Sequence, residues 1–224
     1  MRQGTPERIG ILGGTFDPVH YGHLRTAEEI GEALDLETVY LMPAASPPHK
    51  IHDPVTPFEH RLAMVHLAVQ ESTRLQALDL EGKRAGLSYS FDTLKELTSR
   101  FGTKTEIFFL LGSDAFVEIR TWKNYSKLFE YAHFVIIPRA GYHPEVLHDF
   151  ILGLDRTAKK EQRKDIYTMA SGHHVIIQQS TLMDISGTII RNAIHEQKSI
   201  TFLVPEAVRT YILKEGLYRL YEDH

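Results

Sequence analysis

Two histidines beside a glycine turn are the first residues whose types and spacing could do chemistry. In GGTFDPVHYGHL (residues 13–24) an apolar run ends at Gly13 and Gly14, and His20 and His23 follow, three positions apart. Glycine lets a backbone approach a phosphate closely, and imidazoles at i and i+3 share one face of a helix that has begun. At a helix N-terminus, which favours anions, they could bond phosphate oxygens and stabilise charge that develops during phosphoryl chemistry.

The same residues allow two plainer interpretations. A histidine on a helix face is often structural, and a Gly-Gly turn is often only a turn. A histidine pair at this spacing could also hold a metal, although no third ligand stands at a sensible spacing beside it. The stretch is neither a G-x-G-x-x-G dinucleotide fingerprint nor a Walker P-loop. From these residues alone, anion binding, a structural role and metal binding all stay open.

A second stretch, ISGTIIR (residues 185–191), follows the same logic. Ser186 is a natural N-cap, and Thr188 and Arg191 then share one helix face near the helix start. A hydroxyl and a planar guanidinium suit phosphate, whereas the plainer alternative is a cap followed by a surface arginine. Two anion-binding helix starts in one chain suggest a polyphosphate held between them.

Further candidates lie on the connecting segments. The proline-stiffened loop SPPHK presents Lys50, which is either a point-charge partner for a phosphate or an exposed loop residue. Asp114 follows an apolar run and could accept from a ribose hydroxyl or cap a helix. Trp122 is the only tryptophan, and a single tryptophan usually belongs to a core. We expect no metal held by protein ligands.

Hydrophobic patterning predicts the elements that position these residues. Apolar runs predict strands at 8–12, 38–42, 74–80, 105–111, 133–137 and 175–178. Amphipathic stretches predict helices at 24–34, 57–71, 91–100, 187–196 and 205–215, and the stretch 144–171 is expected to be helical and irregular. Thr56 is expected to cap the second helix, with Glu59 completing a capping box. The alternation predicts an α/β fold with a doubly wound, mostly parallel sheet, in which ligands bind at the carboxyl ends of the strands.

The composition limits the remaining classes. The 224 residues, 42% hydrophobic and 24% charged, suit a single domain over 1–224, with residues 1–7 flexible and 186–224 a C-terminal helical part. A formal net charge of −4 argues against a nucleic-acid partner. A cysteine-free chain with a polar N-terminus, and no apolar run near the about 20 residues of a membrane span, is expected to be cytoplasmic, without a membrane partner.

These motifs together resemble those of a known family. GGTFDPVHYGHL and ISGTIIR resemble the T/H-x-G-H and I-S-S/A-T-x-I-R signatures of the nucleotidyltransferase superfamily, and the first string is similar to that of bacterial nicotinate-nucleotide adenylyltransferases. PPHK, SYSFDTL and the segment from Gly112 to Trp122 also resemble that family, and the likeness runs from Ile9 to about Tyr218. Gly187 stands where the family usually has Ser or Ala.

The resemblance implies a Rossmann-like nucleotidyltransferase fold with C-terminal helices, and adenylyl transfer from ATP to nicotinate mononucleotide in NAD biosynthesis, with Mg²⁺ accompanying ATP. It implies that His20, His23 and Arg191 are catalytic. The ATP-binding residues that it implies are Gly13, Gly14, Thr15, Phe16, His20, His23, Gly112, Asp114, Ile185, Ser186, Thr188 and Arg191. The residues that it implies for the acceptor are Lys50, Ser90, Trp122 and Arg139.

Three alternative functions stay open from the sequence. Phosphopantetheine adenylyltransferases share the first motif, but they are typically shorter and lack PPHK and the G-x-D…W segment. Nicotinamide mononucleotide could be the acceptor, because backbone donors that leave no trace in the sequence could distinguish an amide from a carboxylate. A nucleotide-binding module without chemistry is the third alternative, and a homo-oligomer is a further hypothesis about partners.

Overall fold

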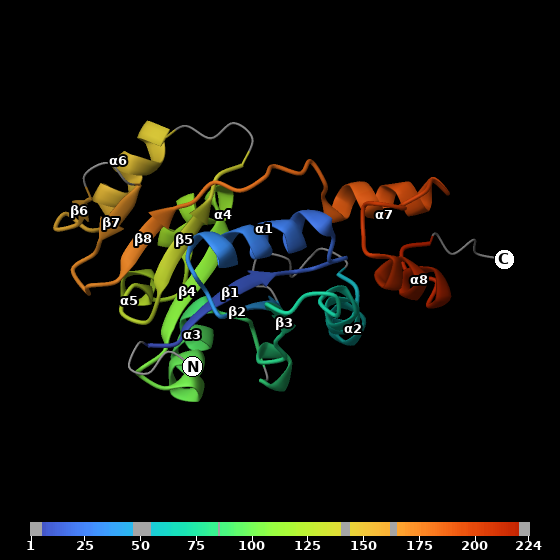
Figure 1. Ribbon diagram of the computed structural model, residues 1–224, viewed down its shortest axis with the longest axis horizontal. Helices are drawn as coiled ribbons and strands as arrows, with labels where there is room; N and C mark the ends of the chain where they lie inside the picture. Colours follow the sequence, from blue (N-terminus) through green and yellow to red (C-terminus); the bar gives the residue numbers. More distant parts are fainter. Residues whose placement is uncertain (1–5, 47–54, 85, 140–143, 162–164, 220–224) are drawn as a thin grey trace.

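The structure, a computed structural model, describes residues 6–46, 55–84, 86–139, 144–161 and 165–219. Within these ranges eight strands form one sheet in the order β3-β2-β1-β4-β5-β8-β7-β6, and helices lie against it (Figure 1). The strands are β1 (Arg8–Gly14), β2 (Thr38–Pro43), β3 (Leu75–Ala77), β4 (Glu106–Gly112), β5 (His133–Ile137), β6 (Lys159–Lys160), β7 (Ile166–Thr168) and β8 (His174–Ile177). The helices are α1 (Tyr21–Ala33), α2 (Phe58–Ala68), α3 (Ser90–Phe101), α4 (Ser113–Val117), α5 (Tyr125–Leu128), α6 (Pro144–Leu154), α7 (Gly187–His195) and α8 (Glu206–Lys214), with 3-10 turns η2 (Glu81–Lys83) and η3 (Ile119–Thr121).

The strand order confirms the predicted doubly wound α/β fold. Strand β1 pairs in parallel with β2 on one side and with β4 on the other, and β3, β5 and β8 continue the parallel sheet. The chain order of the strands reverses between β1 and β4, so the carboxyl ends of these two strands border the crevice where α/β sheets of this type bind ligands.

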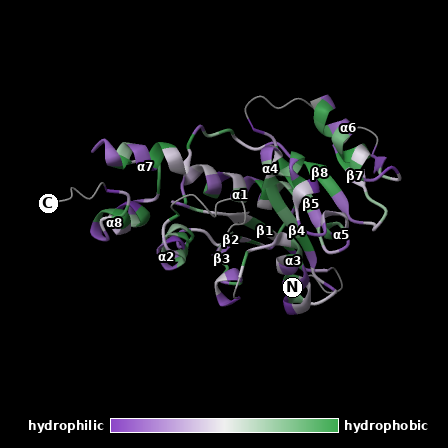
Figure 2. Cartoon of the chain, turned by 180° about the vertical axis from the view of Figure 1, so that it is seen from behind, coloured by the Kyte–Doolittle hydropathy of each residue, from purple (hydrophilic) through white to green (hydrophobic). Residues whose placement is uncertain are grey.

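Two apolar cores cover the two faces of the sheet. Alternate residues of one strand face opposite sides, so Ile9 and Ile11 belong to one core and Leu12 to the other. The core that contains Leu12 includes side chains of α1, α2, α7 and α8. The core that contains Ile9 and Ile11 includes side chains of α3, α4 and α6. Figure 2 shows the central strands mostly in green, as expected for parallel strands that are buried on both faces. No helix in the described ranges is long and apolar enough to cross a membrane.

The start of α2 differs from the predicted one. Thr56 does not cap the helix and Glu59 completes no capping box; the N-cap is Pro57, without a side-chain bond. Tertiary partners use the Thr56 backbone instead, because its N–H donates to Asp17 Oδ2 (3.3 Å) and its carbonyl accepts from Arg61 Nε (2.8 Å). The helix also ends at Ala68, before the predicted Glu71.

The region 144–171 contains more than the predicted helix and irregular chain. After α6, strands β6 and β7 add an antiparallel edge to β8. These strands are two and three residues long, too short for an alternating pattern to be visible in the sequence. The short helices α4 and α5 and the 3-10 turns were also not predicted, because three to five residues are too few to show a helical period.

A stack of rings lies at the amino-terminal end of the strands, opposite the crevice. The Arg8 guanidinium covers the Phe108 ring (4.7 Å to its centre), and Phe108 stacks on His133. The His133 Nδ1 accepts from His174 N (3.0 Å), and the side chain is buried. Burial first, and then the neighbouring His173, His174 and Arg8, lower the pKa of His133 to about 3.

This buried imidazole should make the fold sensitive to acid. Below its ordinary pKa of 6.5 the unfolded chain takes up a proton that the native His133 refuses until about pH 3, so the free energy of unfolding falls as pH falls through 6.5. Between pH 7 and 5 the loss is about 2 kcal/mol. We expect His133→Asn, which keeps an acceptor for His174 N–H and does not titrate there, to remove about this much of the pH dependence of urea unfolding. An unchanged dependence would contradict the assignment.

Candidate active site

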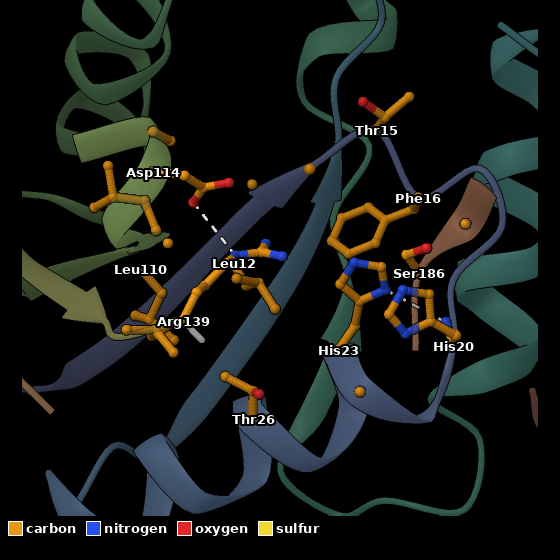
Figure 3. Close-up of a pocket in the computed structure, with 18 of the residues that line it drawn as sticks. Leu12, Thr15, Phe16, His20, His23, Thr26, Leu110, Asp114, Arg139 and Ser186 are labelled. Carbon is orange, nitrogen blue, oxygen red and sulfur yellow. Dashed lines mark hydrogen bonds and ion pairs between the residues drawn. The ribbon is translucent and has the colours of Figure 1, made fainter. Parts of the chain in front are cut away.

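A cavity of about 830 Å³ lies at the carboxyl ends of β1 and β4 (Figure 3). This volume is within the range of small-molecule sites. Of the residues predicted for the site, Lys50 lies outside the described residues, and the structure brings all the others to this one cavity. These are Gly13, Gly14, Thr15, Phe16, His20, His23, Ser90, Gly112, Asp114, Trp122, Arg139, Ile185, Ser186, Thr188 and Arg191.

The glycine turn ends β1 with an aromatic ring packed against it. Phe16 has a left-handed backbone (φ 51°), and a Cβ added at Gly14 would lie 3.1 Å from Phe16 Cζ. The Phe16 ring is buried and meets the His23 ring edge to face, with centres 4.9 Å apart. Glycine at position 14 therefore makes room for the Phe16 ring, which packs against His23.

His20 and His23 lie at the start of α1, which begins at Tyr21, three residues before the predicted start. His20 is the N-cap residue and His23 is in the first turn, and their rings stack with centres 3.7 Å apart (Figure 3). The His20 backbone N–H donates to His23 Nδ1 (3.3 Å). Because Nδ1 accepts this bond, the neutral His23 ring carries its proton on Nε2, which is the nitrogen left to donate to a ligand.

Both imidazoles are neutral near pH 7. Burial, and secondly the positive charge of Arg139, lower the pKa of His20 to about 4. Burial, followed by His20 and then Arg139, holds the pKa of His23 well below 6.5. The pair therefore offers hydrogen-bond donors without charge, and among the described lining residues the fixed positive charge comes from Arg139 and Arg191.

The second predicted motif starts α7 as expected. Ser186 is the N-cap, and its Oγ accepts from Ile189 N (3.2 Å). Arg191 donates from one terminal nitrogen to Thr188 Oγ1 (3.2 Å) and from the other to the backbone carbonyl of Asp17 (2.6 Å). This last bond joins the segment before α1 to α7, so the two predicted anion sites form one assembly.

Gly187 has a steric reason in this arrangement. A Cβ added there would lie 2.6 Å from the Asp17 carbonyl oxygen and 3.1 Å from an Arg191 terminal nitrogen. Glycine therefore lets the Asp17 carbonyl approach the first turn of α7 closely. The resemblance to a family with Ser or Ala at this position gave no indication of that approach.

Asp114 and Arg139 meet at the ends of β4 and β5. Asp114 Oδ1 lies 3.3 Å from Arg139 Nε, and both side chains are exposed (Figure 3). The Arg139 backbone N–H donates to Ser113 Oγ (3.3 Å). Trp122, at the end of η3, is half-buried against the core and lines the cavity nearby. An aspartate predicted to bind ATP thus forms an ion pair with an arginine predicted to bind the acceptor.

Several lining residues were missed in the sequence, including Thr26, Glu81, Ser88 and the segment 180–184. Within that segment Thr181 donates from its N–H (2.5 Å) and its hydroxyl (2.6 Å) to the Glu29 carboxylate on α1. Both bonds lower the pKa of Glu29, and the bond from the Thr181 hydroxyl has the larger effect. The segment has no periodic pattern, and its position just before ISGTIIR was the one available signal.

No three His, Asp or Glu side chains in the part of the chain that the structure describes are arranged to hold a metal ion. Two of the carboxylates that line the cavity already accept from protein donors. Asp17 accepts from Tyr218 Oη (2.6 Å), and Glu81 accepts from Thr93 Oγ1 (2.6 Å). A third, Asp114, is paired with Arg139.

Comparisons with known proteins agree with the fold and with the family that the sequence resembles. A family model described as cytidylyltransferase-like matches residues 11–193. The chain is 42% identical to a probable nicotinate-nucleotide adenylyltransferase of Desulfatibacillum aliphaticivorans, covering 94% of this chain and 99% of that protein. A protein of the same name from Geotalea daltonii is also 42% identical, over 94% and 98% of the two chains.

A solved structure shares the fold at low identity. The Plasmodium falciparum nicotinic acid mononucleotide adenylyltransferase complexed with NaAD has a TM-score of 0.71 and 19% identity, covering 95% of this chain and 97% of that one. A second structure of that protein, complexed with APC, has a TM-score of 0.69. Together these findings confirm the predicted Rossmann-like nucleotidyltransferase fold.

The low pKa of His20 can be tested directly. We expect an NMR titration of histidine ring signals in the ligand-free protein to give His20 a midpoint near 4, because the ring is buried beside Arg139. Arg139→Met should raise this midpoint but leave it below 6.5, since burial is the larger cause. A wild-type midpoint near 6.5 would show that burial and Arg139 do not act on the His20 ring, and it would refute the lowered pKa.

Proposed function

The chain belongs to the nicotinate-nucleotide adenylyltransferases, within the cytidylyltransferase-like family, and we propose on this premise that it transfers the adenylyl group of ATP to nicotinate mononucleotide. The products are nicotinate adenine dinucleotide and pyrophosphate, a step of NAD biosynthesis. The observation that supports the proposal most is the meeting of two helix starts, α1 and α7, at one cavity, joined by the Arg191–Asp17 bond.

The reaction needs no covalent nucleophile from the protein. A phosphate oxygen of the acceptor attacks the α-phosphorus of ATP, forming the new P–O bond as the bond to the departing pyrophosphate breaks on the opposite side. Two anionic reactants must be held in line, so catalysis depends on positioning and on stabilising charge that moves toward the pyrophosphate. A cavity with two helix N-termini and two arginines suits this requirement.

We assign roles to the predicted residues on chemical grounds. His20 and His23 donate to the α- and β-phosphates, His23 through Nε2–H, and stabilise the developing charge. Ser186, Thr188 and Arg191 bind the β- and γ-phosphates, and the first turn, from Gly13 to Phe16, surrounds the nucleotide with Gly112, Asp114 and Ile185. A guanidinium has five N–H donors, so Arg191 can bind a phosphate while it keeps its bond to Asp17.

The acceptor side is assigned to Ser90, Trp122, Arg139 and Lys50. The indole of Trp122 suits stacking on a flat pyridine ring, and the cations suit a mononucleotide phosphate or a ring carboxylate. Ser90 is the first residue of α3 and lines the cavity.

We further propose that Mg²⁺ enters with ATP, held largely by phosphate oxygens and water, as the engaged carboxylates around the cavity suggest. When bound it would neutralise phosphate charge. We propose that the whole chain acts as one domain, because the cavity is lined by residues from Leu12 to Arg191. A cytoplasmic location, no nucleic-acid partner and a homo-oligomer stay predictions from the sequence.

The identity of the acceptor is tested by measuring pyrophosphate release from ATP in the presence of Mg²⁺. Nicotinate mononucleotide, nicotinamide mononucleotide and phosphopantetheine are supplied in parallel reactions. We expect nicotinate mononucleotide to give by far the highest kcat/KM. Release with one of the other acceptors alone would keep the chemistry and change the acceptor. Binding of ATP without release in any mixture would favour a nucleotide-binding module.

His23 is the sharpest test of the chemistry. We expect His23→Ala to lower kcat by about 100-fold or more, the scale for loss of one preorganised donor. Because His23 Nδ1 also accepts from His20 N–H, His23→Asn is the matched variant: its amide oxygen can keep that bond while the Nε2 donor is lost. Near-normal turnover of a folded His23→Asn protein would refute the role.

A further inference from the structure

A buried arginine outside the cavity lining binds backbone carbonyls of three separate segments. Arg61, on α2, is 1% exposed, and its Nε donates to Thr56 O (2.8 Å). One terminal nitrogen donates to Thr15 O (2.7 Å) and Ala44 O (2.8 Å), and the other to Ala45 O (3.3 Å). These carbonyls belong to the turn after β1, the segment after β2 and the residue before Pro57, so one side chain ties three loops together.

The burial of Arg61 is chemically unusual. A buried guanidinium is commonly paired with a carboxylate, since a buried charge is destabilising unless its partners compensate for lost water. Here backbone carbonyls supply that compensation. The arginine therefore depends on the positions of the loops, and the loops depend on the arginine.

A buried glutamate acts on the same segment from the other side. Glu81, on η2, is 5% exposed and lines the cavity. Its Oε2 accepts from Ala45 N (3.4 Å), and its Oε1 accepts from Thr93 Oγ1 (2.6 Å), which in turn accepts from Arg84 (3.0 Å). The Ala45 N–H thus meets a buried anion and the Ala45 carbonyl meets a buried cation.

The remaining backbone groups of residues 44–46 are also bonded. Ala44 N donates to Gly14 O (2.9 Å), Ser46 N donates to Ser88 Oγ (3.0 Å), and Ser88 N donates to Ser46 O (3.0 Å). All six backbone N–H and C=O groups of this short segment therefore have protein partners, although it belongs to no strand or helix. Such complete bonding fixes residues 44–46 beside Glu81 and Ser88, and Ala44, Glu81, Ser88 and Ser90 all line this wall of the cavity.

We propose that Arg61 and Glu81 are positioning residues for the acceptor, a proposal that rests on the adenylyltransferase function. Glu81 bonds both to residue 45 and to Thr93 on α3, the helix that begins at Ser90, the residue assigned to the acceptor. Arg61 joins the same wall, through residues 44 and 45, to Thr15 in the nucleotide turn. The pair thereby sets the distance between the acceptor and the α-phosphorus, which in-line transfer requires to be correct within a fraction of an ångström.

The Glu81 variants separate geometry from charge. Glu81→Ala should raise the KM for nicotinate mononucleotide about tenfold while the KM for ATP changes less than about twofold, because the wall loses its partner at Ala45. Glu81→Gln should restore near wild-type values, since its amide oxygen can accept from Ala45 N–H and its NH₂ can donate to Thr93 Oγ1, whose hydroxyl can turn. Equal changes in both KM values for Glu81→Ala would overturn the proposal.

The Arg61 variant has a matched control at the other end of the sheet. Arg61→Lys keeps the charge, but one ammonium cannot reach carbonyls of three segments, so kcat and kcat/KM for the acceptor should fall about tenfold or more. Arg74, which donates to the carbonyls of Gly31 (3.2 Å) and Leu36 (2.6 Å), tests loss of a similar contact elsewhere. Arg74→Lys should lower thermal stability without changing either KM. Identical kinetics for the two lysine variants would reduce Arg61 to a structural role.

Amide hydrogen exchange of the ligand-free protein measures how firmly residues 45 and 46 are held without any measurement of turnover. Ala45 and Ser46 N–H should be protected in the wild type and exchange faster in Glu81→Ala, or in the milder Ser88→Ala if the first variant does not fold. Wild-type protein that shows this protection but no turnover with nicotinate mononucleotide would refute the proposed function and leave the fixed wall intact. Unchanged exchange in a folded variant would overturn the positioning role even in an active enzyme.

Discussion

Asp17 is the residue at which four distant segments of the chain are joined by hydrogen bonds. Its carbonyl accepts from Arg191 on α7, and its buried carboxylate accepts from Thr56 N–H before α2 and from the Tyr218 hydroxyl (2.6 Å) near the end of the described chain. Burial, and then the adjacent Asp17, raise the pKa of Tyr218, so the phenol keeps its proton and donates. The orientation of both helix starts at the cavity depends on Asp17. Asp17 lies in the segment that leads into α1, and its carbonyl is bonded directly to Arg191 on α7.

The electrostatic design of the cavity follows from which groups are buried there. Two stacked imidazoles would repel each other if both were charged, and burial keeps both neutral. Among the described residues that line the cavity, positive charge is left to Arg139 and Arg191. The site therefore separates two tasks that one lysine or one imidazolium could combine, namely donation at fixed geometry and neutralisation of phosphate charge.

Patterns that repeat within a few residues were readable from the sequence. The strand 133–137 has the predicted bounds, the central strands are apolar runs, and the two motifs meet at one cavity as the doubly wound topology required. Features that depend on distant partners were not readable. Thr56 was predicted as a cap, but its backbone bonds to Asp17 and Arg61 instead, and the burial of Arg61 depends on distant carbonyls that no local pattern indicates. Strands of two or three residues, such as β6 and β7, are too short to show an alternating hydrophobic pattern.

The two edges of the sheet have a consequence for association between copies of the chain. An open edge strand exposes unpaired backbone groups to which another strand can add. At one edge β6 has two residues, the exposed Lys159 and Lys160, and at the other β3 has three. Neither described edge offers a backbone long enough for stable strand addition, and like charges on β6 would repel a second copy of itself. Any assembly of this chain through its described residues would have to be built from helix and loop surfaces, leaving the sheet a closed interior feature of each protomer.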